Sequence, residues 1–355
     1  MSSVSAAPAI APAITIGRPV GPGHPPMIVA ELSANHLGRL DRAIAIVEVA
    51  AAAGCDAVKL QTFTPEAMTL DASRADFHIA DGPWQGRSLW DLYDEAHTPL
   101  AWHAPLFARA RELGLVVFST PFDDAAIDAL ERLGAPAYKI ASFELVDLAL
   151  IARAAATNKP LIMSTGMAAD AEVDEAVATA KANGTGGVIL LHCVSGYPTR
   201  AEDTNLRRMD ALLRHGIVGL SDHSPGAVVP IAAVARGACM IEKHLTLARA
   251  DGGPDAAFSL EPAEMVEVVR ACRMAWAALG DGSATRPASE SSSRQFRRSL
   301  YAVADIAPGE PLTAANVRSI RPGHGLAPRE LPAVLGKNAK VAIARGTPLA
   351  WELLA

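Results

Sequence analysis

The feature that most constrains the fold of this chain is a repeated alternation of short apolar runs and Ala-rich segments with helical spacing. Eight runs are continuously apolar, as expected of strands that are covered on both faces. They are residues 27–32, 57–60, 115–118, 137–140, 161–163, 188–191, 217–220 and 239–241. Segments such as 40–53, 123–133, 171–182 and 228–236 separate them. Strands that alternate with helices of this length form βα units on a parallel sheet.

Eight such units within about 250 residues predict an α/β fold of the (β/α)8, or TIM, barrel type. A doubly wound open sheet is the alternative. Its dinucleotide-binding form would place a Gly-rich turn after the first strand. Here that turn reads Glu-Leu-Ser-Ala-Asn-His over residues 31–36. We therefore predict a TIM-barrel catalytic domain over residues 27–280.

The segments that flank the barrel differ from it in composition. Residues 1–26 are rich in Ala and Pro, and no Lys or Arg precedes Arg18, which argues against a signal peptide. We expect an N-terminal extension with a short strand near Ile14–Ile16. Residues 281–294 are polar and Ser-rich, as in a linker. Residues 295–355 are punctuated by Gly and Pro and predict a small β-rich domain.

Charge and cysteine content exclude several classes of protein. The 32 basic and 38 acidic residues give a net charge of −6, which argues against a nucleic-acid partner. The chain has no apolar stretch that approaches the length of a membrane span. Cys55, Cys193, Cys239 and Cys272 are far apart, so we expect small buried side chains, no disulfide framework and a reducing, cytoplasmic location.

The charge is also unevenly divided along the chain. Residues 294–355 hold nine basic and four acidic residues, a net of +5, which leaves −11 for the rest. This division favours two domains with different roles.

Almost every predicted strand ends in residues that can do chemistry. The carboxyl ends of all barrel strands share one rim, where the active sites of such barrels are built. Polar groups there need partners, so their concentration predicts an active site. The candidates are Glu31, Lys59, Gln61, Ser119, Thr120, Lys139, Ser142, Glu144, Ser164, Thr165, His192, Cys193, Ser195, Tyr197, Ser221, Asp222, His223, Glu242, Lys243 and His244.

Two lysines narrow the chemistry of this rim. Lys59 and Lys139 follow different strands, and with Ser142, Ser164 and Thr165 they would cradle a phosphorylated anion. Two alternatives stay open for each lysine. It could pair with a buried acid, or it could form a Schiff base if a second cation lowered its pKa.

His223 and His244 follow neighbouring strands and could bind one divalent cation. Completed by oxygen ligands, such a site suits Mn²⁺ or Mg²⁺ better than structural zinc. The alternative is a pair of histidines that only donate hydrogen bonds. Glu31 is a candidate general base, typically worth about 10²–10⁴ in rate, or else an ion-pair partner of Lys59. His36 is the candidate to orient Glu31.

Longer motifs add a resemblance. They are ELSANHLG (31–38), VKLQTFTPE (58–66), STPFD (119–123), YKIASFEL (138–145), STGM (164–167), GLSDHS (219–224), IEKHLTL (241–247) and GGPDAAFSLEPAE (252–264). This set resembles the sialic acid synthase family, and residues 296–326 resemble its C-terminal antifreeze-like (SAF, β-clip) domain. The SANH, SFE and DAAFS strings are closest to the pseudaminate branch. Sialic and legionaminic branches are the alternative.

The resemblance implies an enzyme that condenses phosphoenolpyruvate with open-chain 2,4-diacetamido-2,4,6-trideoxy-altrose, giving pseudaminic acid and phosphate. Glu31 would act on the attacking water or on the adduct, and His223 and His244 would bind Mn²⁺, with Mg²⁺ or Co²⁺ as alternatives. The implied phosphoenolpyruvate ligands are Lys59, Thr120, Lys139, Ser142, Ser164, Ser195, Tyr197 and Ser221. Gln61, Glu144 and Asp255 would contact the sugar or metal-bound water, and Arg321 would contact the sugar.

The resemblance further implies a domain-swapped homodimer in which Arg321 reaches the partner's site, whereas Arg318 is expected to be a surface residue. Two positions depart from the family pattern. Leu37 stands where relatives usually carry Asn or another polar residue, and Ser195 stands where sialic acid synthases often carry Asn. Two other interpretations are a Schiff-base aldolase that uses Lys139 or Lys59, and a non-catalytic carbohydrate- or ice-binding protein.

Overall fold

The computed structural model describes residues 12–355, so residues 1–11 of the predicted N-terminal extension lie outside it. The chain divides into two compact units, which meet in sequence between Gly280 and Asp281. Each is described by itself. Among the described residues, no helix combines the length and apolar character that a membrane crossing requires.

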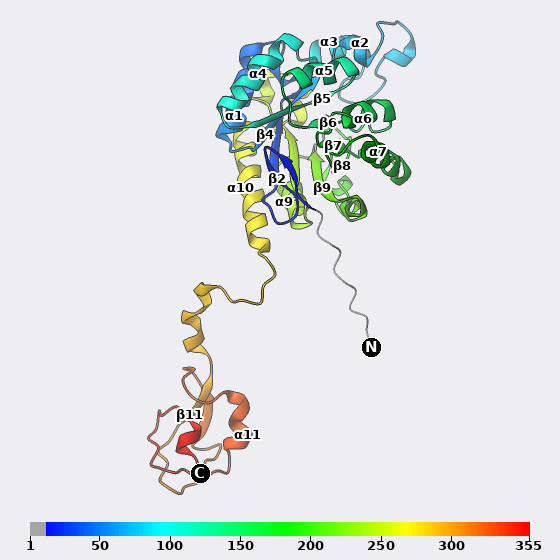
Figure 1. The fold of residues 1–355 in the computed structure, drawn as a ribbon. Helices are drawn as coiled ribbons and strands as arrows, with labels where there is room; N and C mark the ends of the chain where they lie inside the picture. Colours follow the sequence, from blue (N-terminus) through cyan, green and yellow to red (C-terminus); the bar gives the residue numbers. More distant parts are fainter. Residues whose placement is uncertain (1–11) are drawn as a thin grey trace. The chain divides into compact units, whose positions relative to one another are not determined.

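The first unit is a closed barrel of eight parallel strands, and the predicted fold class is confirmed (Figure 1). Its circular order is β10-β3-β4-β5-β6-β7-β8-β9, so the last strand pairs with the first and no open sheet edge remains. The strands are β3 (Met27–Glu31), β4 (Ala57–Thr62), β5 (Val116–Pro121), β6 (Tyr138–Ile140), β7 (Leu161–Ser164), β8 (Val188–Cys193), β9 (Ile217–Asp222) and β10 (Met240–His244). All eight predicted runs are strands, and most extend by one to three residues at the carboxyl end.

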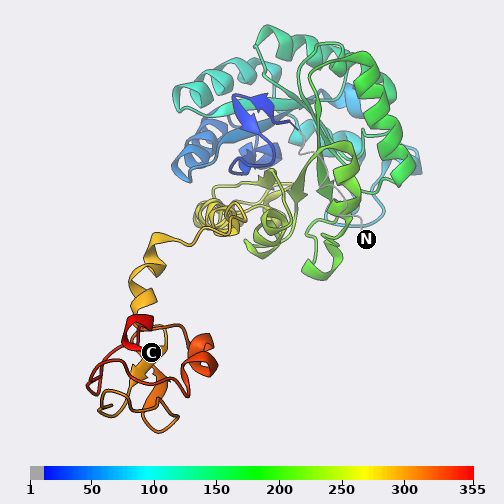
Figure 2. The ribbon, with the colours of Figure 1, turned by 60° about the horizontal axis from the view of Figure 1, so that its bottom comes forward.

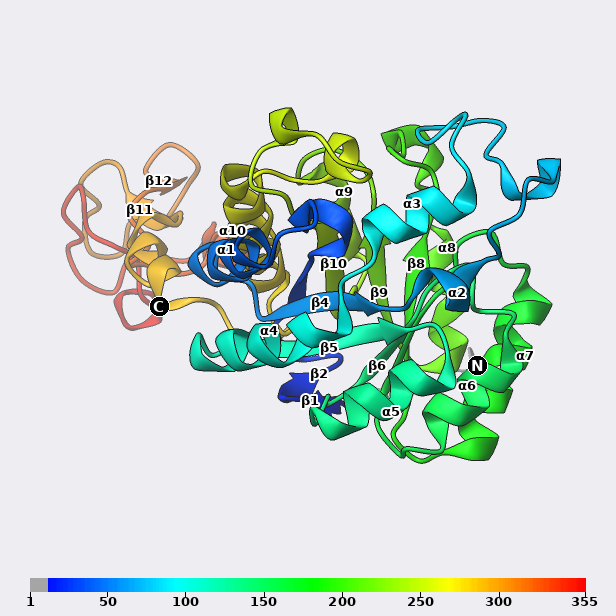
Figure 3. The same ribbon diagram turned by 90° about the horizontal axis from the view of Figure 1, so that it is seen from above.

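Helices form the outer layer of the barrel (Figure 3). They are α1 (Leu40–Ala52), α2 (Pro65–Met68), α3 (Leu89–Ala96), α4 (Leu100–Glu112), α5 (Asp124–Arg132), α6 (Leu148–Ala155), α7 (Asp170–Asn183), α8 (Arg208–Leu212), α9 (Val228–Ala235) and α10 (Pro262–Leu279). Helix α5 illustrates the local causes. The side chain of Asp123 accepts a hydrogen bond from the Ala126 N–H at 2.7 Å and caps the helix, while Ile127 and Leu130 bury its inner face.

A short hairpin covers the amino ends of the barrel strands (Figure 2). Strand β1 (Ile14–Ile16) lies where a short strand was predicted, and it pairs with β2 (Arg18–Val20). Ile16 and Val20 are fully buried in one cluster with apolar side chains at the starts of the barrel strands. The amino end of the barrel is therefore filled with apolar side chains, and the polar side chains gather at its carboxyl end.

The second unit is the predicted small β-rich domain. Strands β11 (Ser299–Ala302) and β12 (Val317–Ile320) pair antiparallel, and helix α11 (Leu331–Val334) follows. Its own core is a cluster of buried side chains that includes Leu300, Leu312, Val317, Ile343 and Leu349. Residues 281–298, which include the predicted linker, are exposed.

Candidate active site

The carboxyl ends of the barrel strands surround a cavity of about 590 Å³. Most of the predicted site residues line it, namely Lys59, Gln61, Lys139, Ser142, Glu144, Ser164, Ser195, Tyr197, Ser221, His223, His244 and Asp255. Glu31 and Thr120 join them through contacts with Lys59. Arg321 lies in the second unit, where it is exposed, as is Arg318. The barrel thus brings together all the residues to which the resemblance gave a catalytic, substrate or metal role, except Arg321.

Strand alternation decides which polar side chains reach this cavity. Successive side chains of a strand point to opposite faces. On β10, Glu242 and His244 therefore face the cavity, whereas the intervening Lys243 points away. Lys243 forms a buried 2.9 Å ion pair with Asp222, which points away from the cavity on β9. Both members of this pair were candidates from sequence, and the structure assigns them to packing between strands.

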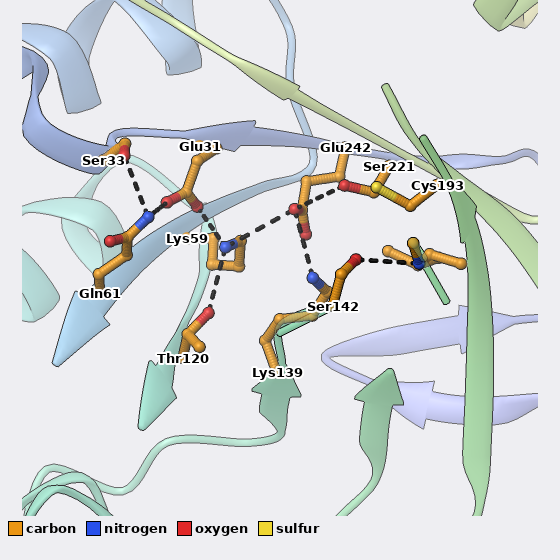
Figure 4. Close-up of polar contacts among 12 residues, drawn as sticks. Glu31, Ser33, Lys59, Gln61, Thr120, Lys139, Ser142, Cys193, Ser221 and Glu242 are labelled. Carbon is orange, nitrogen blue, oxygen red and sulfur yellow. Dashed lines mark hydrogen bonds and ion pairs between the residues drawn. The ribbon is translucent and has the colours of Figure 1, made fainter. Parts of the chain in front are cut away.

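Two lysines and two glutamates form a buried charge network beneath the cavity (Figure 4). The Lys59 ammonium lies 2.7 Å from the Glu31 carboxylate and 3.6 Å from that of Glu242. The Lys139 ammonium lies 3.5 Å from the same oxygen of Glu242. All four side chains are at most 5% exposed. Both lysines are thus paired with acids, as one alternative proposed, and both still border the cavity.

Burial and neighbouring charges shift the pKa values of the groups in this network in different directions. Burial raises the pKa of Glu31, and the Glu242 charge adds to the rise against the opposing effect of Lys59. Burial alone would also raise the pKa of Glu242, but Lys139 and Lys59 together hold it below its usual range. Burial lowers the pKa of Lys139, and the neighbouring Lys59 charge contributes. Glu31 is therefore the carboxylate of the two that accepts a proton more readily.

Two serine hydroxyl groups that line the cavity lack hydrogen-bond partners among the described residues. The Oγ atoms of Ser164 and Ser195 are buried and form no hydrogen bond within residues 12–355. The Gly166 N–H donates to Ser142 Oγ at 3.1 Å, and a Cβ atom at Gly166 would collide with the hydroxyls of Ser142 and Ser195. An unpaired buried hydroxyl costs about 1–3 kcal/mol, so this arrangement suits a bound anion.

Thr165, which sequence analysis placed in the same cradle, is used differently. Its hydroxyl donates to the Leu191 carbonyl oxygen at 3.3 Å. The side chain therefore ties the end of β7 to β8, and that prediction was wrong for this residue.

The two predicted metal ligands lie side by side, with ring centroids 5.3 Å apart. His223 Nδ1 donates to the Val194 carbonyl oxygen at 3.1 Å, so in the neutral ring Nε2 is the nitrogen with a free lone pair. His244 Nδ1 is buried without a hydrogen-bond partner in the described part of the chain. Burial keeps the pKa of His244 well below its usual value, so the ring is neutral, the form that binds metals.

The donor set at this place fits a divalent cation that takes most of its ligands from elsewhere. Over residues 12–355 no three His, Cys, Asp or Glu side chains are grouped so as to hold an ion by themselves. Two imidazoles would therefore share the ion with oxygen atoms of water or substrate, as Mn²⁺ tolerates.

Two of the predicted sugar contacts, Gln61 and Asp255, are connected to Glu31. The Gln61 amide nitrogen donates to Glu31 Oε1 and to Ser33 Oγ, each at 3.0 Å. Ser33 in turn donates to the Asp255 carboxylate. His36, predicted to orient Glu31, instead accepts from the Gly38 N–H and packs against Trp102, so that prediction was wrong. Gln61 takes the orienting position.

Glu144 stands apart from this network at the outer part of the cavity. Its Oε2 atom is buried and has no partner among the described residues. Burial raises the pKa of Glu144 to about 7. The carboxyl group can therefore either donate or accept a hydrogen bond near neutral pH.

Glu242 and Cys193 were predicted only as candidates at strand ends, Glu242 without a specific role and Cys193 with the expectation of a small buried side chain. Glu242 joins both lysines, and its placement two residues before His244 on a strand could have revealed that the two share a face. The four cysteines are buried and unpaired, but Cys193 lines the cavity and lies 4.0 Å from His223 Nδ1. The position of Cys193 at the carboxyl end of a strand is the sequence signal that distinguishes it from the other three.

Comparisons with known proteins agree with this geometry. The family model described as NeuB family matches residues 46–284, and that of the SAF domain matches residues 297–355. A pseudaminic acid synthase of Helicobacter pylori is 43% identical over 92% of this chain and 97% of its own. One of Campylobacter jejuni is 42% identical over 91% and 94%. The crystal structure of the N-acetylneuraminic acid synthetase of Leptospira borgpetersenii is 31% identical with a TM-score of 0.71, covering 80% of this chain and 95% of that one.

Proposed function

This chain belongs to the NeuB family, and we propose that it condenses phosphoenolpyruvate with open-chain 2,4-diacetamido-2,4,6-trideoxy-altrose to form pseudaminic acid and phosphate. Identity of 42–43% to pseudaminic acid synthases over more than nine-tenths of the chain supports this choice of product over sialic or legionaminic acid. The observation that carries the proposal is the buried Lys59–Glu242–Lys139 network beside unpaired serine hydroxyls.

Phosphoenolpyruvate is the anion that this cradle would hold. Lys59 and Lys139 supply positive charge, and the hydroxyls of Ser142, Ser164 and Ser195 supply directed donors. Binding would give the buried hydroxyls the partners that they lack. Because these groups are already in place, most of the rate enhancement would come from positioning and electrostatic stabilisation.

The reaction forms one carbon–carbon bond. The methylene carbon of phosphoenolpyruvate attacks the sugar aldehyde, whose oxygen takes up a proton and becomes a hydroxyl. Positive charge develops at the second carbon of phosphoenolpyruvate, and water adds there. The C–O bond to phosphate then breaks and phosphate leaves. Glu31 Oε1 or Oε2 would take the proton of the attacking water, and Gln61 would hold that carboxylate in place.

A divalent cation, with Mn²⁺ as first choice and Mg²⁺ or Co²⁺ as alternatives, would be held by His223 and His244. When bound, it would supply Lewis acidity toward the aldehyde oxygen. The neutral His244 ring and the free Nε2 atom of His223 support this assignment.

The second unit enters the proposal through Arg321. In a domain-swapped homodimer, this exposed arginine would contact the sugar bound in the partner subunit. The +5 charge of residues 294–355 against −11 for the rest of the chain favours such an arrangement. The free cysteines and the use of phosphoenolpyruvate favour a cytoplasmic location.

A panel of sugars tests the proposal. The protein is incubated with phosphoenolpyruvate, Mn²⁺ and either the altrose derivative, N-acetylmannosamine or the legionaminic acid precursor, and the product mass is measured together with phosphate. We expect a nine-carbon product from the altrose derivative at the highest kcat/KM. A higher value with another sugar would replace pseudaminic acid by the corresponding product.

The Schiff-base alternative is tested in the same preparation. Lys139 is the lysine that such an aldolase would use, because burial lowers its pKa. Borohydride reduction in the presence of pyruvate should leave the protein mass unchanged. A stable adduct on Lys139, with activity that survives chelation of metals, would favour the aldolase.

A further inference from the structure

Aromatic side chains form a separate layer outside the charged network. On β4 and just beyond it, Lys59, Gln61 and Phe63 alternate and so face the same side. The register of β4 and β5 pairs Gln61 with Thr120 and ends at Thr62 with Pro121, so Phe63 and Phe122 are the next neighbours. Their rings meet edge to face, with centroids 5.2 Å apart. The cavity lining therefore changes along β4 from the charged Lys59 to the aromatic Phe63.

Tyr93 of helix α3 completes this layer. Its ring also meets that of Phe63 edge to face, at a centroid distance of 6.0 Å. Phe63, Tyr93 and Phe122 all line the cavity and are called here the aromatic corner. Phe63 is only 6% exposed, whereas Tyr93 and Phe122 are half-buried, so the corner has a fixed base and a face open to the cavity.

The position of the corner relates it to one end of the sugar. The aldehyde carbon must reach the methylene carbon of phosphoenolpyruvate, which the lysine layer would hold. An open chain that runs outward from the lysines along β4 and β5 reaches the layer of Phe63 and Phe122. Its last carbon, C6, carries a methyl group in the proposed substrate and a hydroxyl group in most hexoses.

We propose that the aromatic corner receives the C6 methyl group of the sugar and thereby makes the enzyme selective for a 6-deoxy sugar. The inference rests on the proposed function. A methyl group gains by leaving water for three aromatic rings. A hydroxyl at the same place would lose hydrogen bonds to water and meet mainly ring edges and faces, since the Tyr93 hydroxyl is the one polar side-chain group of the corner.

Two sugars that differ only at C6 test this inference. They are 2,4-diacetamido-2,4,6-trideoxy-altrose and the same compound with a 6-hydroxyl group, each assayed with phosphoenolpyruvate and Mn²⁺. In the unaltered protein, we expect kcat/KM to favour the 6-deoxy sugar by about 10–100-fold, the range that one small apolar contact provides. Equal values for the two sugars would overturn the inference. Failure of both sugars, with turnover of another amino sugar, would instead overturn the proposed function.

Phe122→Ser should reduce this preference to less than about threefold, mainly by lowering kcat/KM for the 6-deoxy sugar. The KM for phosphoenolpyruvate should stay unchanged. Phe77→Ser is the matched control, because Phe77 is also half-buried but does not line the cavity. A preference that survives in Phe122→Ser, or that falls equally in Phe77→Ser, would contradict a role of the corner.

Tyr93→Phe tests whether the preference comes from contact with the ring or from a hydrogen bond of the hydroxyl group. It also provides a test if Phe122→Ser fails to fold. The preference should remain within about threefold of the original value, because the ring is kept. A collapse of the preference would mean that the Tyr93 hydroxyl reads the sugar. A third sugar, which lacks the 4-acetamido group, completes the test. If the corner contacts the acetamide methyl group instead, Phe122→Ser should change the ratio of kcat/KM between the sugars with and without that group. The ratio between the 6-deoxy and 6-hydroxy sugars should then stay unchanged.

Discussion

Glu31 and Lys59 are register partners on β3 and β4, and their side chains form a 2.7 Å ion pair that is almost completely enclosed. Adjacent strands of the barrel thus fix the distance between the two groups. The ammonium group also donates to Thr120 Oγ1 at 3.1 Å. Glu31 is therefore held just behind the cavity lining, with one oxygen toward Lys59 and the other toward Gln61, both of which line the cavity.

Replacing Glu31 by Gln should lower kcat by about 10²–10⁴, the usual contribution of a general base. The KM for phosphoenolpyruvate should change by only a few-fold, because the lysines and serines remain. Phosphate release under saturating substrates measures the effect. Glu48→Gln, which removes a half-exposed partner of Arg109, is the control and should keep full activity. A near-normal kcat in Glu31→Gln would mean that another group takes the proton of the attacking water.

Glu242→Gln should both destabilise the protein and weaken phosphoenolpyruvate binding, because it leaves two buried ammonium groups without their shared partner. Removing one member of a buried ion pair costs about 3–5 kcal/mol. Urea unfolding and the KM for phosphoenolpyruvate measure the two effects. Adding Lys139→Met to the Glu242→Gln variant should restore part of the stability but not the activity. If the double variant is no more stable than Glu242→Gln, the charge network is not the cause.

Glu144 predicts a pH dependence of stability. Burial raises its pKa in the folded protein from 4.5 to about 7, so the folded state binds a proton that the unfolded state releases. The stabilisation is complete below about pH 4.5 and is lost as the pH rises through about 7. Relative to Glu144→Gln, the unaltered protein should thus lose about 1–3 kcal/mol of unfolding free energy between pH 5 and pH 8. The measurement is the free energy of chemical unfolding as a function of pH. The same pH dependence in both proteins would refute the assignment to Glu144.

His244→Ala should abolish binding of Mn²⁺, as followed by the electron paramagnetic resonance signal of the free ion. Each imidazole supplies one of only two protein nitrogens at the proposed site, so the remaining His223 would not hold the ion at micromolar concentration. His215→Ala, which removes a ring paired with Asp174 at 2.9 Å and outside the cavity, serves as the control. Unchanged Mn²⁺ binding in His244→Ala would mean that the metal binds at another site.

Arg321→Ala should raise the KM for the sugar by at least about tenfold and leave that for phosphoenolpyruvate unchanged, because a bidentate arginine contact is worth about 1.5–3 kcal/mol. Arg318→Ala is the matched control, since Arg318 is also exposed and lies three residues earlier on β12. Deletion of residues 295–355 should have the same selective effect on sugar use. Equal effects on both substrates, or equal effects of the two arginine variants, would argue against the proposed contact.

The fold was predictable in detail because its signals are local. Apolar runs of strand length, Ala-rich helical segments and turn residues repeat eight times, and each of the eight runs became a barrel strand. Site residues at the strand ends followed from the same pattern, since the carboxyl ends of parallel strands share one rim. The disposition of Thr165 and His36 did not follow, because a hydroxyl or a ring can turn toward neighbours that only the folded chain supplies.

The sequence by itself therefore determined the barrel, the small C-terminal domain and the set of side chains at the rim, because strand and helix periods are written into neighbouring residues. Only the tertiary structure decided which of these side chains contact one another. Glu242 lies between Lys59 and Lys139 because closure of the barrel brings the ends of β10, β4 and β6 to within contact. Phe63 lies against Phe122 because β4 and β5 pair in register. Burial then sets the charges of these groups, and burial depends on the whole fold.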